Sequence, residues 1–241
     1  MKTIGSTIIM LALASSLFAD NGKELKLASP DGTHEIVFYQ KQVSPAVNEL
    51  CYRVDYKSQP VVNESRAGLE LDNRIWEMAL GVRNLKQPAC WMDNLEVDSV
   101  TYQPETNLTW QPLYGERSSV RDHYRAGTLC LSKKDNSGYR LNIEVRAYNE
   151  GVAFRYFFPE HPKAIFHKVV GDLTEYALPA GTKAWTEQWA QAFFERLNID
   201  DIKHPVERAL TFELPNGKWA ALADADVDDW CLTKYLVSTD K

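Results

Sequence analysis

The sequence predicts an all-β protein in which many short strands form a sandwich or a barrel. Two stretches, residues 50–57 and 141–148, alternate apolar and polar side chains with a period of two, as half-buried strands do. Turn signals such as Asp31-Gly32 and Asn216-Gly217 separate strand-like runs at close spacing. No helical stripe extends over more than a few turns, and residues 187–200 are the best candidate for a short helix.

Individual strands can be placed beside these turns. Residues 34–39 form a β-rich run directly after Asp31-Gly32. Residues 210–214 and 219–222 flank Asn216-Gly217, which is typical of a tight hairpin turn. These runs are therefore expected to be strands, and the second pair a hairpin.

The hairpin around Asn149-Glu150 can be tested for register. With these two residues as the turn, Val145 faces Phe154 and Glu144 faces Arg155, so an apolar pair and an opposite-charge pair occupy the two faces. A slip of one residue would move every side chain to the wrong face. The two-residue turn is the predicted register, with Glu144–Arg155 as a structural ion pair.

Length and composition narrow the class of protein. The 241 residues, 44% hydrophobic and 25% charged, are those of an ordinary globular chain that buries a sizeable core. The net charge of −6 provides no basic footprint for phosphate backbones, so nucleic acid is excluded as an expected partner. Prolines and glycines are scattered at turns, and we expect one domain over residues 23–241.

The N-terminal segment has the pattern of a secretory signal. Lys2 precedes the apolar or small run of residues 4–18, and Ala19 offers a cleavage site before Asp20. The run is too short for a spanning helix, and an ordinary buried helix is the alternative. We therefore expect residues 1–19 to be a signal peptide and the protein to be periplasmic or secreted.

The four cysteines, Cys51, Cys90, Cys130 and Cys231, are widely and irregularly spaced. This spacing fits neither a zinc site nor a small disulfide scaffold. Export would permit disulfides with three possible pairings, but free thiols, buried in strands, are the favoured interpretation.

Three stretches carry a resemblance to a known family. They are residues 110–124, which begin Trp-Gln-Pro-Leu-Tyr-Gly-Glu-Arg; residues 144–156, which contain Arg-Ala-Tyr and Gly-Val-Ala-Phe-Arg-Tyr; and residues 221–235, which contain Asp224-Ala225-Asp226 and Asp229-Trp230. Together they resemble the N-terminal domain of glycoside hydrolase family 97, over nearly the whole chain that would follow the signal.

This resemblance implies a fold and a partner. The family's N-terminal domain is a large two-sheet antiparallel β-super-sandwich, similar to galactose mutarotase. In the full enzymes, which are exo-acting α-glucosidases and α-galactosidases, a catalytic (β/α)8 barrel follows. The domain packs on the mouth of that barrel and contributes one glutamate to a calcium site beside the catalytic carboxylates.

The family's calcium-binding glutamate falls on an aromatic-Glu pair, which matches Phe194-Glu195 in this chain. Glu195 is therefore the expected Ca²⁺ ligand, and a carboxylate is the hard oxygen donor that calcium prefers. Because calcium takes six to eight oxygens, most ligands would come from the barrel and from water. A solvated surface glutamate is the alternative interpretation.

The chain also departs from the family. Asp224 stands where the family usually has Glu, and Trp230 where it usually has Tyr. The resemblance implies a sandwich truncated at its C-terminal end and a barrel wholly absent. Glycoside hydrolysis needs two positioned carboxyl groups, and no local motif marks such a pair. No catalytic residue is assigned, and no glycosidase activity is expected from this chain alone.

Two alternative functions remain open at this stage. A mutarotase-like enzyme would use a carboxylate base and histidine acids, but none of the five histidines is matched to a particular glutamate in the sequence. A stand-alone sugar-binding module would stack sugars on aromatic rings; the candidates near loops or strand ends are Trp91, Trp110, Trp185, Trp189 and Trp230.

Overall fold

The structure is a computed structural model that describes residues 23–45, 47–71, 95–133, 139–160, 167–228 and 230–238. The predicted signal peptide, Cys90, Trp91, His161 and Asp229 lie outside the described residues. Within those residues the chain is built of β-strands, with no α-helix and one short 3-10 turn. No described helix is long and apolar enough to cross a membrane.

The first sheet contains four antiparallel strands that follow one another in the chain. They are β1 (Glu24–Ala28), β2 (His34–Ser44), β3 (Val47–Tyr56) and β4 (Gln59–Arg66). Lys57 and Ser58, both with positive φ, form the two-residue turn between β3 and β4. Positive φ at both turn residues matches the right-handed twist of the flanking strands.

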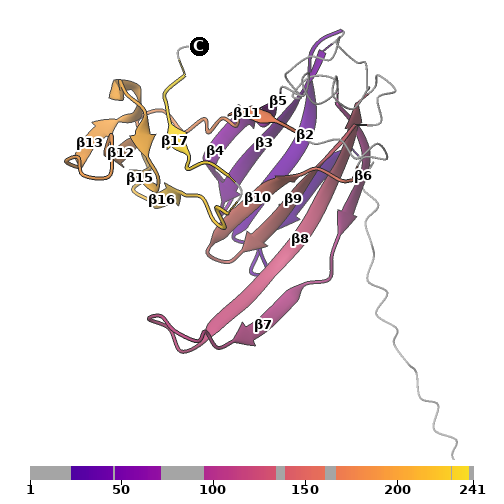
Figure 1. The fold of residues 1–241 in the computed structure, drawn as a ribbon, viewed down its shortest axis with the longest axis horizontal. Coiled ribbons are helices and arrows are strands. Elements are labelled where there is room, and N and C mark those ends of the chain that lie inside the picture. Colours follow the sequence, from indigo (N-terminus) through magenta and orange to yellow (C-terminus); the bar gives the residue numbers. More distant parts are fainter. Residues whose placement is uncertain are drawn as a thin grey trace, which may run out of the picture.

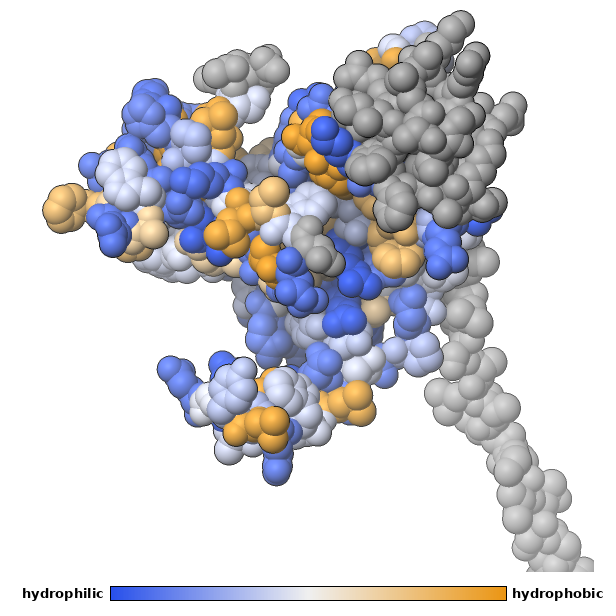
Figure 2. Space-filling model, in the orientation of Figure 1, coloured by the Kyte–Doolittle hydropathy of each residue, from blue (hydrophilic) through white to orange (hydrophobic). Residues whose placement is uncertain are grey.

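The second sheet contains five antiparallel strands and has a long central strand. They are β6 (Leu95–Tyr102), β7 (Thr106–Trp110), β8 (Val120–Lys133), β9 (Arg140–Tyr148) and β10 (Gly151–Phe157), in the order β10-β9-β8-β6, with β7 also paired to β8. The pairing of β8 with β9 ends at Tyr124–Tyr148, so the β7–β8 hairpin extends beyond the rest of the sheet as an arm (Figure 1), which also stands apart in the space-filling view (Figure 2).

The two sheets pack face to face and enclose the main core (Figure 1). Phe38 from the first sheet is fully buried, stacks on Tyr52 at 5.2 Å between ring centroids, and meets Phe154 of the second sheet edge-on at 5.2 Å. Gly127 lets the sheets approach, because a Cβ there would lie 3.2 Å from Leu25 Cδ1. The alternating strands thus bury one face each against the opposite sheet.

A smaller lobe follows the sandwich and contains the C-terminal part of the described chain (Figure 1). Its sheet has the order β13-β12-β15-β16, with a two-stranded ribbon beside it. The elements are β12 (Lys183–Thr186), β13 (Glu195–Asn198), the 3-10 turn η1 (Ile199–Asp201), β14 (Val206–Glu207), β15 (Leu210–Glu213), β16 (Trp219–Leu222) and β17 (Lys234–Tyr235). Between sandwich and lobe, β11 (Val169–Asp172) pairs with β5 (Leu69–Leu71).

The predicted all-β class and both predicted hairpins are confirmed. Gly151 pairs with Tyr148, so Asn149-Glu150 is the two-residue turn, and Arg155 Nε lies 2.7 Å from Glu144 Oε2. The Asn216-Gly217 turn joins β15 to β16, with φ +76° at Gly217.

The short helix expected at residues 187–200 was wrong. Residues 195–198 form β13, and only η1 is helical in that region. The reason lies in the tertiary structure, because each residue of β13 pairs with one of β12, from Glu195–Thr186 to Asn198–Lys183. Strand pairing across a loop overrides a weak local preference for helix.

The described cysteines agree with the interpretation as free thiols, but of these only Cys51 is buried. Cys51, Cys130 and Cys231 are free, and Cys51 is buried in β3. Burial raises the pKa of the Cys51 thiol to about 11, because the interior disfavours the thiolate. Cys51 is therefore an inert structural thiol. Cys231, in contrast, is exposed.

Candidate functional site

Glu195 lies at the start of β13, directly after a loop rich in exposed aromatic rings. This aromatic loop comprises residues 187–194, and Phe193 in it is 93% exposed. Trp189 and Phe194 are also more than half exposed. Large exposed apolar side chains gathered in one segment mark a surface that contacts another molecule or domain.

The aromatic loop is held at its base by contacts to β14 and β17. Glu207 N donates to Glu187 O at 2.9 Å, which joins the loop to β14. Lys234 Nζ donates to Gln188 O at 3.2 Å and lies 2.7 Å from Glu207 Oε1. The lysine thus bridges loop and ribbon, so the loop presents its rings from a fixed base.

Glu195 suits the role of a single calcium ligand supplied to a site completed elsewhere. The residue is exposed, and in the described residues its carboxylate has no hydrogen-bond or ion-pair partner. Its backbone is fixed, because Thr186 Oγ1 donates to Glu195 O at 3.2 Å. Within the described residues no group of three or more His, Cys, Asp or Glu side chains could hold a metal by itself.

A hollow of about 1170 Å³ separates the sandwich from the small lobe. Its lining includes Tyr176 and Tyr235, whose rings meet edge-on at 5.8 Å, and three carboxylates, Asp172, Glu175 and Asp224. Burial raises the pKa of Tyr235 to about 12. The hollow is large enough for a sugar.

The three carboxylates of the hollow have partners within the chain, and Glu175 Oε1 accepts a hydrogen bond from Arg66 Nε at 2.8 Å. Asp172 Oδ1 accepts a hydrogen bond from Thr174 N at 3.0 Å, and Asp224 Oδ2 accepts one from Thr233 N at 3.1 Å. Asp224 also lies 3.6 Å from Arg208 Nε. Asp224, one of the residues by which the sequence resembles the family, thereby joins β16 to the segment that leads to β17.

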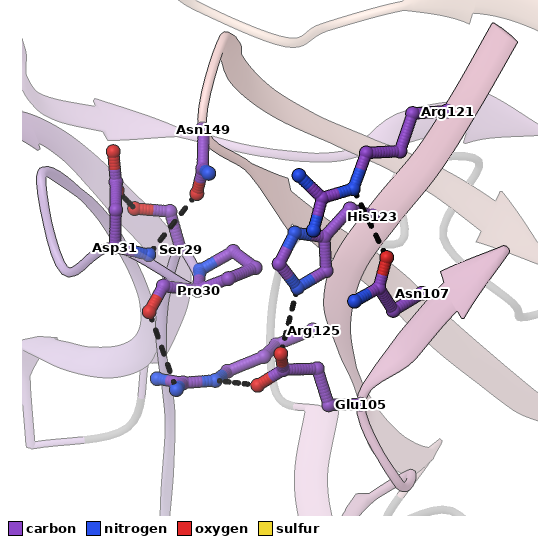
Figure 3. Close-up of polar contacts among 9 residues, drawn as sticks. All are labelled: Ser29, Pro30, Asp31, Glu105, Asn107, Arg121, His123, Arg125 and Asn149. Carbon is purple, nitrogen blue, oxygen red and sulfur yellow. Dashed lines mark hydrogen bonds and ion pairs between the residues drawn. The ribbon is translucent and has the colours of Figure 1, made fainter. Parts of the chain in front are cut away.

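One histidine does pair with a glutamate, which the sequence did not predict. His123 Nε2 lies 2.7 Å from Glu105 Oε1, at the base of the β7–β8 arm (Figure 3). Arg125 Nε donates to the other oxygen of Glu105 at 3.0 Å, and Arg125 also donates to Pro30 O at 3.4 Å. Hydrogen bonds from His123 and Arg125 hold the pKa of Glu105 below its usual range.

The hydrogen bonds of this cluster stabilise the base of the arm. Both carboxylate oxygens of Glu105 are occupied by side chains of β8, and Arg125 connects them to the β1–β2 turn. In that turn Asp31 N donates to Asn149 Oδ1 at 3.0 Å, which brings in the β9–β10 hairpin (Figure 3). The arrangement joins three segments and gives no support to an acid–base role.

The remaining described histidines are also in structural surroundings. His167 stacks on Phe158 at 4.3 Å between ring centroids, and His204 is exposed. His34 lies 4.8 Å from the Tyr56 ring, and burial lowers the pKa of its imidazole. The Nδ1 atom of His34 lies 3.1 Å from the Thr33 hydroxyl oxygen.

The fold and this surface define a β-sandwich domain with a fixed, exposed aromatic loop beside a single carboxylate. The chain belongs to the glycosyl-hydrolase 97 N-terminal family, whose model matches residues 27–240. It is 26% identical over 178 residues to a retaining α-galactosidase of Bacteroides thetaiotaomicron, which covers 74% of this chain. The chain spans about a fifth of that relative, 22% of its length.

Solved structures share the fold. A glycoside hydrolase family 97 enzyme from Pseudoalteromonas sp. strain K8, solved with panose and with acarbose, superposes with a TM-score of 0.67 at 24% identity. The match covers 80% of this chain and 27% of that enzyme. A β-arabinopyranosidase gives a TM-score of 0.65 at 17% identity, over 82% of this chain and 31% of its own.

Proposed function

We propose that this chain is the sandwich domain of an α-glycosidase that acts on α-glucosides or α-galactosides. In this proposal it packs on the mouth of a (β/α)8 barrel that carries the catalytic carboxylates. The observation that carries the proposal is the aromatic loop, residues 187–194, which presents exposed rings from a fixed base directly before Glu195. The family match over residues 27–240 supports the same role.

Within this proposal Glu195 donates one oxygen ligand to a Ca²⁺ ion shared with the barrel. Bound calcium would supply a positive charge that holds and polarises an oxygen of the sugar or of water. The role of Glu195 is to present its carboxylate from a strand fixed by Thr186, while the adjacent rings exclude water from the contact. The remaining ligands are assigned to the barrel.

A chimaera tests this assignment. Residues 23–241 replace the matching N-terminal segment of the B. thetaiotaomicron α-galactosidase, and hydrolysis of p-nitrophenyl α-galactoside is followed against calcium concentration. We expect Glu195→Gln to raise the calcium concentration needed for half-maximal activity by about tenfold, the loss of one charged ligand. Glu187→Gln, in the same loop, is the control and should match the parent chimaera. Equal calcium dependence of all three proteins would contradict the role of Glu195.

The purified chain by itself should not cleave p-nitrophenyl α-glucoside or α-galactoside. The physical reason is that hydrolysis needs an acid and a base or nucleophile on either side of the bond, and both are assigned to the barrel. Cleavage activity that persists through repeated purification would contradict the assignment of the catalytic groups to the barrel. Polarimetry of freshly dissolved glucose or galactose on the same sample tests the mutarotase alternative, for which we expect no acceleration.

We further propose export, with cleavage after Ala19. The basis is the charged Lys2 followed by the apolar run of residues 4–18. Mass spectrometry of the protein recovered from the periplasm or medium should give an N-terminus at Asp20. Recovery of the intact Met1 form in the cytoplasm would contradict the proposal.

A further inference from the structure

The solvent-facing side of the small-lobe sheet has a regular arrangement of side chains. Strand register places eight residues on this face in two rows of four, one from each strand. The rows are Arg196, Trp185, Thr211, Ala221 and Asn198, Lys183, Glu213, Trp219. The opposite face carries the buried Ala184, Phe212 and Leu210. Since side chains alternate along a strand, all eight point away from the lobe's core.

Two tryptophans on this face meet across the central strand. The Trp185 and Trp219 rings lie 4.4 Å apart between centroids with an interplanar angle of 33°. Trp219 is 57% exposed although it belongs to a strand and not to a loop. The two small members of the face, Thr211 and Ala221, leave the surface beside the indoles low and open. We name this surface the tryptophan face.

The indoles are held in place by a charged pair. The Arg196 guanidinium lies over the Trp185 ring at 5.0 Å from its centroid. Arg196 Nη2 donates to Glu213 Oε2 at 2.5 Å, so the contact runs from β13 to β15 past Trp185. Trp185 is therefore covered by Arg196 and Trp219, and the open aromatic surface of the pair is that of Trp219.

These features indicate which kind of ligand the tryptophan face can bind. Arg196 and Glu213 beside the indoles form an ion pair and so do not call for a charged partner, while Lys183 in the second row adds a hydrogen-bond donor. The ordered indole of Trp219 can stack on a flat apolar ring face, and the fixed donors and acceptors beside it can bind hydroxyl groups at the edge of that ring. A pyranose ring has both an apolar face and hydroxyl groups at its edge. We propose that the tryptophan face binds a neutral oligosaccharide of hexopyranose units, stacked on Trp219.

This site is separate from the one proposed for calcium. Glu195 pairs with Thr186 in a register where the neighbouring pair is Arg196–Trp185, so the Glu195 side chain leaves β13 on the opposite face. Sugar binding at the tryptophan face therefore requires neither calcium nor the barrel. It would hold a polysaccharide chain on the enzyme outside the catalytic centre.

Fluorine NMR on the whole chain labelled with fluorotryptophan tests the proposal, with maltotriose and melibiose as probes. We expect at least one of them to shift the Trp185 and Trp219 signals saturably. Sorbitol, which has hydroxyls but no ring face, should not. Trp219→Ala should weaken the binding followed at Trp185 by about tenfold. Trp110→Ala, which removes a Trp 52% exposed on β7, is the matched control and should leave it unchanged.

Three results would overturn the proposal. The first is that neither sugar gives a saturable shift. The second is that sorbitol shifts the same signals equally. The third is that sedimentation shows a dimer that Trp219→Ala converts to monomer, which would make this face an interface between copies. Glu195→Gln should retain sugar binding, so failure here and failure of the calcium assignment are distinguishable.

Discussion

The sandwich and the small lobe are built from the same kind of strand but are stabilised to different degrees. The sandwich core contains 19 buried residues, drawn from both sheets, whereas the lobe core contains six among the described residues. The sandwich adds a set of contacting rings, Phe38, Tyr52 and Phe154, at its centre. The lobe instead places its paired rings, Trp185 and Trp219, on the solvent side.

This contrast indicates that the sandwich and the small lobe have different roles. The sandwich encloses contacting rings in its core and supplies stability, while the lobe presents a ring pair, Trp185 and Trp219, on a surface for binding. Val61 and Leu178 pack against both cores, so the lobe is supported by the sandwich across their seam. A lobe with so small a core is not expected to be stable by itself. Substitutions in the two cores test this dependence.

Phe38→Ala should have the largest effect, because it removes a fully buried ring that contacts both sheets. We expect a loss of about 3–5 kcal/mol in the free energy of unfolding. Urea denaturation followed by circular dichroism gives the value. Phe157→Ala, which removes a ring 42% exposed on β10, is the control and should cost much less. If the lobe stayed folded after the sandwich had melted, the proposed dependence would be wrong.

Phe212→Ala should act on the lobe alone. Phe212 is 1% exposed in the small core, so its replacement should lower the free energy of local unfolding of the lobe by about 3–5 kcal/mol. Because the lobe core is small, we expect local unfolding and not loss of the whole fold. Amide exchange should rise in β12, β15 and β16 but not in β2 or β9. Phe193→Ala, at a position 93% exposed, is the control and should leave exchange unchanged.

The sequence predicted the sandwich better than the lobe, and the reason is the range of the interactions. The β9–β10 register follows from residues that lie close together in the chain, where turn length and charge pairing agree. In the lobe, β12 pairs with β13 and with β15, whose residues are brought together only by the fold. The helix expected at residues 187–200 was wrong because local periodicity does not reveal such pairing.

The candidate sites could be predicted from the sequence only in part, for the same reason. Glu195 was assigned through a resemblance in one short segment, and the structure shows that it is exposed beside the aromatic loop, but its calcium role stays a prediction. Trp219 was missing from the tryptophans singled out near loops or strand ends. Its partner Trp185 lies on β12, two strands away, and only the sheet order brings the rings together. His123 and Glu105 were unmatched for the same reason.

Asp31→Asn should have a smaller, pH-dependent effect at one end of the sandwich. Hydrogen bonds, first of all from Ser29 Oγ, lower the pKa of Asp31 to about 2. The stabilisation is therefore fully present above pH ~4, the ordinary value for Asp, and is lost as pH falls through about 2. The difference in melting temperature between parent and variant should be constant from pH 7 to 5, decrease below pH ~4 and be largely lost at about pH 2. The same difference at pH 2 and pH 7 would contradict this; Asp228→Asn is the control.

The smallest effect is expected from two exposed ion pairs, one in each region. Glu144–Arg155 lies on the sandwich hairpin, and Arg196–Glu213 crosses the tryptophan face. Each is largely solvent-screened, so double-mutant cycles should give coupling energies of about 0.2–1 kcal/mol. The lobe pair should lie at the upper end, because its side chains are less exposed, 46% and 28%, against 68% and 34% for the sandwich pair. Added salt should reduce the sandwich coupling more than the lobe coupling, since screening is stronger for the more exposed charges. Equal salt sensitivity of the two couplings would mean that this difference in exposure does not alter the screening.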